Sequence, residues 1–184
     1  MELQKLHYDA ADGIAVITMD YPKNLNAIDE QMADELIYAV KTAENDQSVK
    51  AVVFKGSPKA FSAGGDIGYF YKLIKAGGEV NMDGLISKVG KVTDGIKKMS
   101  KMVIASVSGA AAGAGVSLAL TADFIICAEN ASFALPEAKL GIVPDSGGVL
   151  RLPKRLPPAI VNEMVMTGRR MNAEEALRWG IANY

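Results

Sequence analysis

Apolar positions along the chain follow two spacings, short strand-like runs and longer stretches with a helical repeat. Strands are predicted where apolar and β-branched residues cluster, at residues 14–19, 49–54, 102–107, 124–127 and 131–134. Residues 3–7 are predicted to pair with the first of these strands across a turn at 9–13. Helices are predicted at residues 29–44, 67–75, 85–99, 114–121, 136–141 and 157–168, with Gly77-Gly78 breaking the second and another helix beside Gly147-Gly148. The repeated order strand, strand, helix favours an α/β protein with helices packed on sheets, in one domain over residues 1–184.

Two glycine-rich segments, residues 60–67 (AFSAGGDI) and 108–115 (SGAAAGAG), each follow an apolar run and precede a helical one. Small residues there leave backbone N–H groups uncovered, so a ligand oxygen can approach them. The two segments could each direct one N–H at the same carbonyl oxygen and form an oxyanion hole. Either segment alone could equally be a tight strand-to-helix connection, since one glycine cluster is weak evidence. A dinucleotide-binding loop is disfavoured because the glycines lack the G-x-G-x-x-G spacing.

Glu137 and Asp145 lie eight residues apart in a mostly apolar segment, residues 135–148, which contains a helix start and a glycine turn. A carboxyl group in apolar surroundings tends to have a raised pKa, which suits proton transfer near neutral pH. The alternative is that each acid caps the helix that follows it, as Asp29 and Asp66 are also predicted to do.

The composition excludes several classes of function. The formal net charge of the 184 residues is −1, which gives no overall attraction to nucleic acid or to an anionic membrane. The N-terminus lacks the layout of a signal peptide, and no uninterrupted apolar run is long enough to span a bilayer. Cys127 is the only cysteine, so an internal disulfide is excluded and a cytoplasmic protein is predicted. The only histidine, His7, lies far from the other candidates, and no Ser-His-Asp set, metal cluster or Walker loop is present in the sequence.

The glycine segments, the acidic segment and the run PKNLNAI at residues 22–28 together resemble the crotonase (enoyl-CoA hydratase/isomerase) superfamily, over essentially the whole chain. The resemblance implies a spiral of ββα units, assembled into trimers or dimers of trimers, that binds acyl-CoA thioesters. It also implies that the N–H groups of Gly65 and Ala114 hold the thioester oxygen, and that coenzyme A enters as part of the substrate, with no tightly bound cofactor. The residues that it places against the coenzyme A portion are Lys23, Leu25, Ala27, Ala63, Gly65, Asp66 and Ile67.

The chain departs from the pattern of the hydratases, in which two glutamates flank the substrate. The second glutamate falls on Glu137, but the first falls on Ser117, which cannot act as a carboxylate base. Asp145 lies where many hydratases have glycine, and in the isomerases of phenylacetate degradation an aspartate at that place shuttles the proton. The pair of acids also resembles that of 3-hydroxyisobutyryl-CoA hydrolases and dienoyl-CoA isomerases, so the subclass stays open. Members usually continue past the position of Tyr184 into further helices, so the C-terminal helical part is expected to be truncated.

These residues lead to the prediction of an enoyl-CoA isomerase that shifts a 3-ene to the conjugated 2-ene. Asp145 would remove the proton next to the thioester, and the N–H groups of Gly65 and Ala114 would hold the dienolate. Asp145 or Glu137 would return the proton at the far carbon. The alternatives are hydration of a 2-enoyl-CoA with Glu137 activating water, hydrolysis of a 3-hydroxyacyl-CoA, and a non-catalytic scaffold that keeps the fold for assembly.

Overall fold

The computed structural model describes residues 2–77 and 82–184, and the fold begins with a β-hairpin. Strand β1 (Leu6–Ala11) pairs antiparallel with β2 (Ile14–Met19). The predicted strand at 3–7 and turn at 9–13 are therefore wrong in position, because the turn is only the pair Asp12-Gly13. Both residues have a positive φ, 51° and 82°, which is the conformation that a two-residue hairpin requires to match the twist of its strands.

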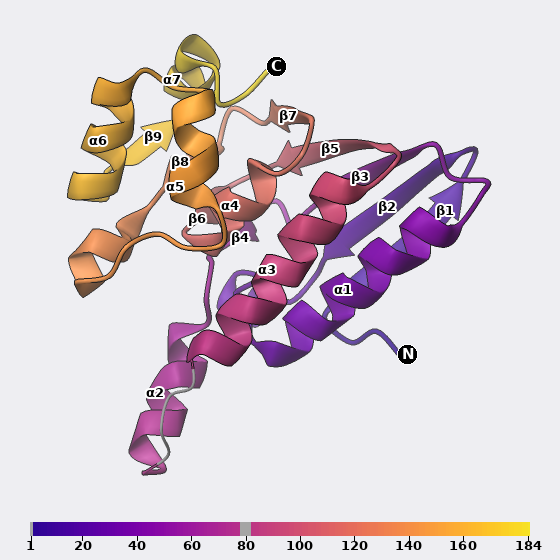
Figure 1. Cartoon of the computed structure of the whole chain (residues 1–184), viewed down its shortest axis with the longest axis horizontal. Helices are drawn as coiled ribbons and strands as arrows, with labels where there is room; N and C mark the ends of the chain where they lie inside the picture. The colour runs from indigo at the N-terminus through magenta and orange to yellow at the C-terminus, as the bar shows by residue number, and fades with distance from the viewer. Residues whose placement is uncertain (1, 78–81) are drawn as a thin grey trace.

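After the hairpin the chain winds as a spiral in which each turn adds one strand to each of two sheets (Figure 1). One sheet has the order β1-β2-β3-β5-β7 and the other β4-β6-β8-β9. The turns of the spiral are β3 (Ala51–Lys55) with β4 (Ala60–Ser62), β5 (Met102–Val107) with β6 (Ala110–Ala112), and β7 (Phe124–Cys127) with β8 (Ser132–Ala134). Strands of successive turns pair in parallel within each sheet. The predicted α/β class and ββα spiral are confirmed, while β4 and β6 are short strands in segments that were predicted to be glycine turns.

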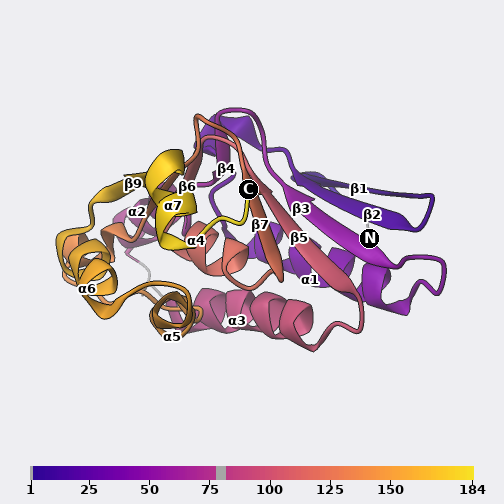
Figure 2. The same ribbon diagram turned by 90° about the horizontal axis from the view of Figure 1, so that it is seen from above.

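Helices α1 (Glu30–Asn45) and α3 (Met82–Lys98) lie side by side against the five-stranded sheet (Figure 2). The side chain of Asp29 accepts a hydrogen bond from the N–H of Met32 at 2.9 Å and caps α1, as predicted. Helix α2 (Ile67–Lys75) begins in the same way at Asp66 and extends away from the sheets in Figure 1. The predicted break at Gly77-Gly78 follows α2, but Gly78 lies outside the described residues.

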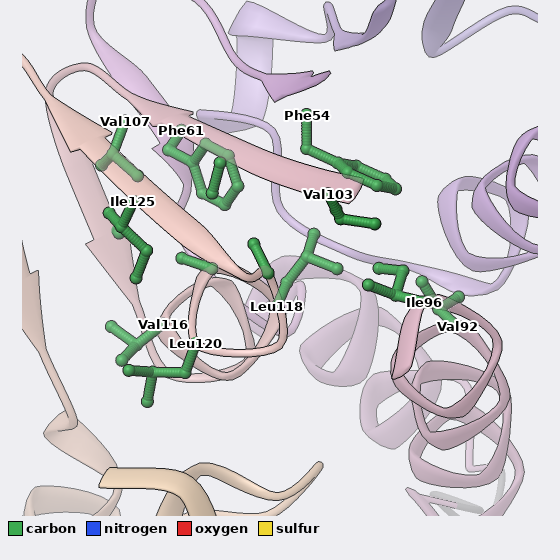
Figure 3. Packing of buried hydrophobic residues seen from close by; sticks show 14 of the residues in the cluster. Phe54, Phe61, Val92, Ile96, Val103, Val107, Val116, Leu118, Leu120 and Ile125 are labelled. Carbon is green, nitrogen blue, oxygen red and sulfur yellow. The ribbon is translucent and has the colours of Figure 1, made fainter. Parts of the chain in front are cut away.

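The short helix α4 (Ala114–Ala119) is packed into the core between the sheets and α3. Figure 3 shows Val116 and Leu118 of this helix in a cluster with side chains from β3, β4, β5, β7 and α3. The helix comes this close to β4 because Gly115 has no side chain, since a Cβ there would lie 2.4 Å from the carbonyl oxygen of Ser62. This packing fixes the start of α4 beside the end of β4.

The rest of the chain forms the orange and yellow part of Figure 1. It consists of η2 (Pro136–Leu140), α5 (Gly148–Arg151), η3 (Leu152–Lys154), α6 (Pro158–Thr167), β9 (Arg170–Asn172) and α7 (Ala173–Trp179). The prediction of a helix that ends near Gly168 is confirmed by α6. Strand β9 and helix α7 were not predicted from the sequence, although the capping box of Asn172 and Glu175 marks the start of α7.

Candidate active site

The two glycine-rich segments meet because β4 and β6 are neighbours in the second sheet. A Cβ at Gly64 would lie 2.6 Å from the carbonyl oxygen of Ala112 and 3.2 Å from the nitrogen of Ala114. Gly64 also has a φ of +87°, which an L side chain would strain. The close approach of the two backbones therefore depends on glycine at this position, and it brings Gly65 near Ala114.

In the part of the chain that the structure describes, the N–H groups of Gly65 and Ala114 both lack a backbone partner. Gly65 and Ile28 form a parallel β-bridge, but its hydrogen bonds involve the residues on either side of Gly65. The N–H of Ile28 donates to the carbonyl oxygen of Gly64, and the N–H of Asp66 donates to the carbonyl oxygen of Ile28. The N–H of Gly65 therefore points to the opposite side. Ala114 is the first residue of α4, where an N–H has no partner within the helix. Neither N–H has an acceptor among the described residues.

Gly65 and Ala114 line one cavity of about 130 Å³. Its apolar wall comes from α2, α3 and the segment around the end of η2, through Ile67, Phe70, Leu85, Ile86, Val89, Leu140 and Ile142. Of these wall residues, only Ile67 was predicted from the sequence to belong to the site. The amphipathic pattern of α3 shows that one face is apolar, but it does not show that part of that face borders a cavity.

Glu137 enters the same cavity from η2, which follows β8. Its carboxylate lies against the second glycine segment, since a Cβ at Gly113 would be 3.0 Å from Glu137 Oε1. The other oxygen, Oε2, is buried and has no hydrogen-bond partner among the described residues. Burial raises the pKa of Glu137, and the charge of Asp145 raises it further. A raised pKa favours the protonated form, as expected of a proton donor.

Asp145 also lines the cavity, in the loop before α5. Its Oδ1 accepts a hydrogen bond from Ser146 Oγ at 2.7 Å. The alternative interpretation of the two acids as helix caps is wrong, because neither η2 nor α5 has a side-chain cap. Ser117, where the resemblance places the first glutamate, is buried in α4 and donates a hydrogen bond to the carbonyl oxygen of Asp145.

Three of the residues predicted to contact coenzyme A line the cavity, namely Ala63, Gly65 and Ile67. Lys23, Leu25, Ala27 and Asp66 do not line it, but hydrogen bonds connect the chain around Asn24 and Leu25 with the Gly65 segment. The N–H of Ala63 donates to the carbonyl of Leu25 at 3.0 Å, and Asn24 donates to the Asp66 carboxylate at 2.8 Å.

The four residues that do not line the cavity differ in how exposed their side chains are. Lys23 and Leu25 are exposed, in and just after the 3₁₀ turn Pro22–Asn24, whereas Ala27 is buried and Asp66 caps α2. Lys23 and Leu25 therefore stay candidates for ligand contact through their side chains. Ala27 could contribute only through its backbone.

None of the helices within residues 2–77 and 82–184 combines the length and apolar character needed to cross a bilayer. In the same residues, no group of three or more His, Cys, Asp or Glu side chains is arranged to hold a metal ion.

Comparisons with known proteins identify relatives along nearly the whole chain. Residues 9–184 match the family model described as enoyl-CoA hydratase/isomerase. Carnitinyl-CoA dehydratase of Citrobacter koseri is 52% identical over 181 residues, covering 98% of this chain and 67% of the relative. The protein of the same name from Salmonella agona is 54% identical with the same coverage. The chain therefore spans about two thirds of the length of these relatives.

Solved structures of the same kind superimpose closely. Enoyl-CoA hydratase from Bacillus anthracis has a TM-score of 0.90 at 29% identity, covering 98% of this chain and 69% of its own. An enoyl-CoA hydratase from Polaromonas sp. has a TM-score of 0.88 at 33% identity, covering 97% and 69%. In this family coenzyme A is part of the substrate and no tightly bound cofactor is used. The spiral fold and the sequence match together show that the chain belongs to the enoyl-CoA hydratase/isomerase (crotonase) family of acyl-CoA enzymes.

Proposed function

We propose that the protein catalyses the reversible dehydration of a 3-hydroxyacyl-CoA to a 2-enoyl-CoA, with carnitinyl-CoA as the first substrate to test. The observation that carries the proposal is that Glu137 and Asp145 line one cavity with Gly65 and Ala114, whose N–H groups have no acceptor among the described residues. The relatives at 52% and 54% identity named carnitinyl-CoA dehydratase favour this direction over a double-bond shift.

The first step is removal of the proton on the carbon next to the thioester. Asp145 takes this proton, and the electron pair moves onto the thioester oxygen to give an enolate. The N–H groups of Gly65 and Ala114 donate to that oxygen. Ala114 begins a helix, so the positive end of the α4 dipole adds to the stabilisation of the negative charge.

The second step is loss of the hydroxyl group at the next carbon. The enolate collapses to form the carbon–carbon double bond, and the hydroxyl takes a proton from Glu137 and leaves as water. The raised pKa of Glu137 suits this role, because the acid holds its proton until the leaving group needs it. Transfer of the proton from Asp145 to Glu137, directly or through water, restores the starting state. Hydration is the same sequence in reverse, with Glu137 activating water.

We assign the role of the second catalytic carboxylate to Asp145 because position 117 is a serine. The family resemblance places a glutamate at position 117, and this chain has a buried serine there. Asp145 is the carboxylate besides Glu137 that lines the cavity in the described part of the chain. The site therefore supports acid–base chemistry with a different pair of residues from the two-glutamate hydratases.

Double-bond isomerisation of a 3-enoyl-CoA is the second candidate, and the same pairing of Asp145 with Ser117 favours it. Both reactions share the enolate, and they differ in whether a hydroxyl leaves or a proton returns at the far carbon. The test is incubation in D₂O with carnitinyl-CoA, 3-hydroxybutyryl-CoA and 3-enoyl-CoA thioesters, with products followed by mass and by absorbance of the conjugated thioester. We expect dehydration of the hydroxy substrates. Conversion of the 3-enoyl-CoA alone would replace this proposal with the isomerase.

We also propose that the protein assembles as a trimer or a dimer of trimers, as the family resemblance implies. The outer face of the five-stranded sheet supports assembly, because Phe124, Ile126 and Met102 are 39%, 43% and 52% exposed on it. Sedimentation equilibrium measures the mass, and a monomer at micromolar concentration would contradict this expectation.

A further inference from the structure

The hydroxyl of Ser146 forms a hydrogen bond with one of the two carboxylate oxygens of Asp145. Ser146 Oγ donates to Asp145 Oδ1 at 2.7 Å, the length of a strong bond to a carboxylate. Within the described part of the chain, Oδ2 has no hydrogen-bond partner. One oxygen is thus held by the protein, and the other is the one left to take a proton from a substrate.

The backbone at this point is strained in a way that glycine would relieve. Ser146 has a φ of +50°, in the left-handed region, and Gly147 follows with +87°. A serine in this conformation is less favourable than glycine, because its Cβ crowds the backbone. Non-glycine residues held in this region cluster at functional sites, so the outlier points to a use for the serine side chain.

Three bonds hold the strained segment in place. The carbonyl oxygen of Asp145 accepts from Ser117 Oγ at 3.1 Å and from the Gly148 N–H at 2.9 Å. The carbonyl oxygen of Ser146 accepts from the Arg151 guanidinium at 2.8 Å. Ser117 is only 1% exposed, and a Cβ at Gly148 would lie 2.8 Å from its hydroxyl, so the helix α4 and the Asp145 loop are in direct contact. The backbone of Asp145 is therefore fixed independently of the bond from Ser146.

We propose that Ser146 is a positioning residue that holds Asp145 Oδ1 so that Oδ2 faces the substrate carbon next to the thioester, with Ser117 fixing the backbone of Asp145 from α4. The inference rests on the proposed function in one respect, that Asp145 removes the proton. It also gives Ser117 a role, because its hydroxyl donates a hydrogen bond to the backbone carbonyl oxygen of Asp145.

The test uses Ser146→Gly, which removes the hydroxyl and also relieves the left-handed strain. We expect the urea unfolding midpoint to move little, since the relief of strain offsets the lost bond. We expect kcat for dehydration to fall about tenfold or more, as for a misplaced catalytic group, while KM stays the same. Ser146→Ala should give the same loss of kcat, because it lacks the same hydroxyl.

The matched control is Ser48→Gly. Ser48 Oγ also donates to an aspartate Oδ1, that of Asp46, at 2.7 Å, but in an exposed loop whose residues do not line the cavity. This variant should leave kcat and KM unchanged. A second control combines Ser146→Gly with Asp145→Asn, because loss of the hydroxyl should have no further effect once the base is gone.

A second readout separates this inference from the proposed function. Exchange of the protons next to the thioester of butyryl-CoA in D₂O needs the base but no leaving hydroxyl. If the wild type exchanges these protons without dehydrating any substrate, and Ser146→Gly slows the exchange, the positioning role stands and the proposed function fails. An unchanged kcat in Ser146→Gly, a rise in KM alone, or a full effect in the Asp145→Asn background overturns the positioning role. A wild type that neither exchanges nor dehydrates overturns both.

Discussion

Replacement of Glu137 by glutamine should stabilise the fold while it removes turnover. Glu137 Oε2 is buried without a partner among the described residues, and burial and the charge of Asp145 raise the pKa of the carboxyl. An unsatisfied buried polar group costs about 1–3 kcal/mol, and more when it is charged. The side chain is only partly buried, so water screens part of this cost. Glutamine leaves the same place without a partner but carries no charge, so it relieves only the additional cost of the charge, and we expect Glu137→Gln to raise the free energy of unfolding by about 1 kcal/mol at pH 7.

The stability gain of Glu137→Gln is expected to depend on pH in a definite direction. Because the pKa of Glu137 is raised in the folded protein, the folded state binds the proton more tightly than the unfolded state. The penalty in the wild type is therefore largest near neutral pH, and it disappears as the pH falls below about 4, where the carboxyl is protonated in both states. The gain from glutamine, which cannot ionise, should follow the same curve.

Urea unfolding of both proteins at pH 7 and at pH 4 measures the gain. Glu129→Gln is the control, because Glu129 is exposed and its replacement should stay within about 0.5 kcal/mol. Dehydration by Glu137→Gln should fall about 10²–10⁴-fold, since the amide cannot donate the proton. A variant that is less stable than the wild type at pH 7, or whose advantage persists at pH 4, refutes the reasoning.

Three further changes test other parts of the molecule. Asp145→Asn should lower dehydration and proton exchange about 10²–10⁴-fold in steady-state assays, and an unchanged rate would remove Asp145 from the base role. Lys23→Ala should weaken acetyl-CoA binding in calorimetric titration, because its exposed ammonium is expected to pair with a phosphate, and equal affinity would contradict this. Gly115→Ala should lower the free energy of unfolding in urea by about 1–3 kcal/mol, because the methyl group would lie 2.4 Å from the Ser62 carbonyl oxygen. Gly90→Ala, where an added Cβ meets nothing within 4 Å, is its control and should not destabilise the protein.

The parts of the fold that the sequence predicts well are those with a strong local signal. Asp29 and Asp66 each bind the N–H three residues later, so the caps of α1 and α2 depend on a few consecutive residues. The three-residue strands β4 and β6 carry no such signal, because they pair with strands far away in the sequence: β4 with β6, and β6 also with β8. The error in the hairpin has a different cause. The Asp12-Gly13 pair is by itself a strong signal for a two-residue turn, but the turn was predicted over the longer range 9–13.

The parts of the site that could be predicted from the sequence are those formed by glycine-rich segments and by acidic residues. The glycine segments indicated where two N–H groups are uncovered, and the acids at 137 and 145 lay in an apolar run. The cavity wall could not be predicted, because Phe70 and Leu85 reach it through the packing of α2 and α3. The hydrogen bond from Ser146 could not be predicted either, since it depends on a left-handed backbone that the residue type does not favour.

Three residues of the site follow the ends of three strands in the second sheet, and this arrangement determines when the site forms during folding. Gly65 follows β4, Ala114 follows β6 and Glu137 follows β8, so each turn of the spiral contributes one functional group at the same sheet edge. No stretch of the chain shorter than three turns contains Gly65, Ala114 and Glu137 together, and the contacts between the turns join residues that are far apart in the sequence. Such contacts form late and slowly, because long loops must close first. An acyl-CoA ligand would therefore bind only the completed spiral and, by mass action, would slow hydrogen exchange across all three turns together.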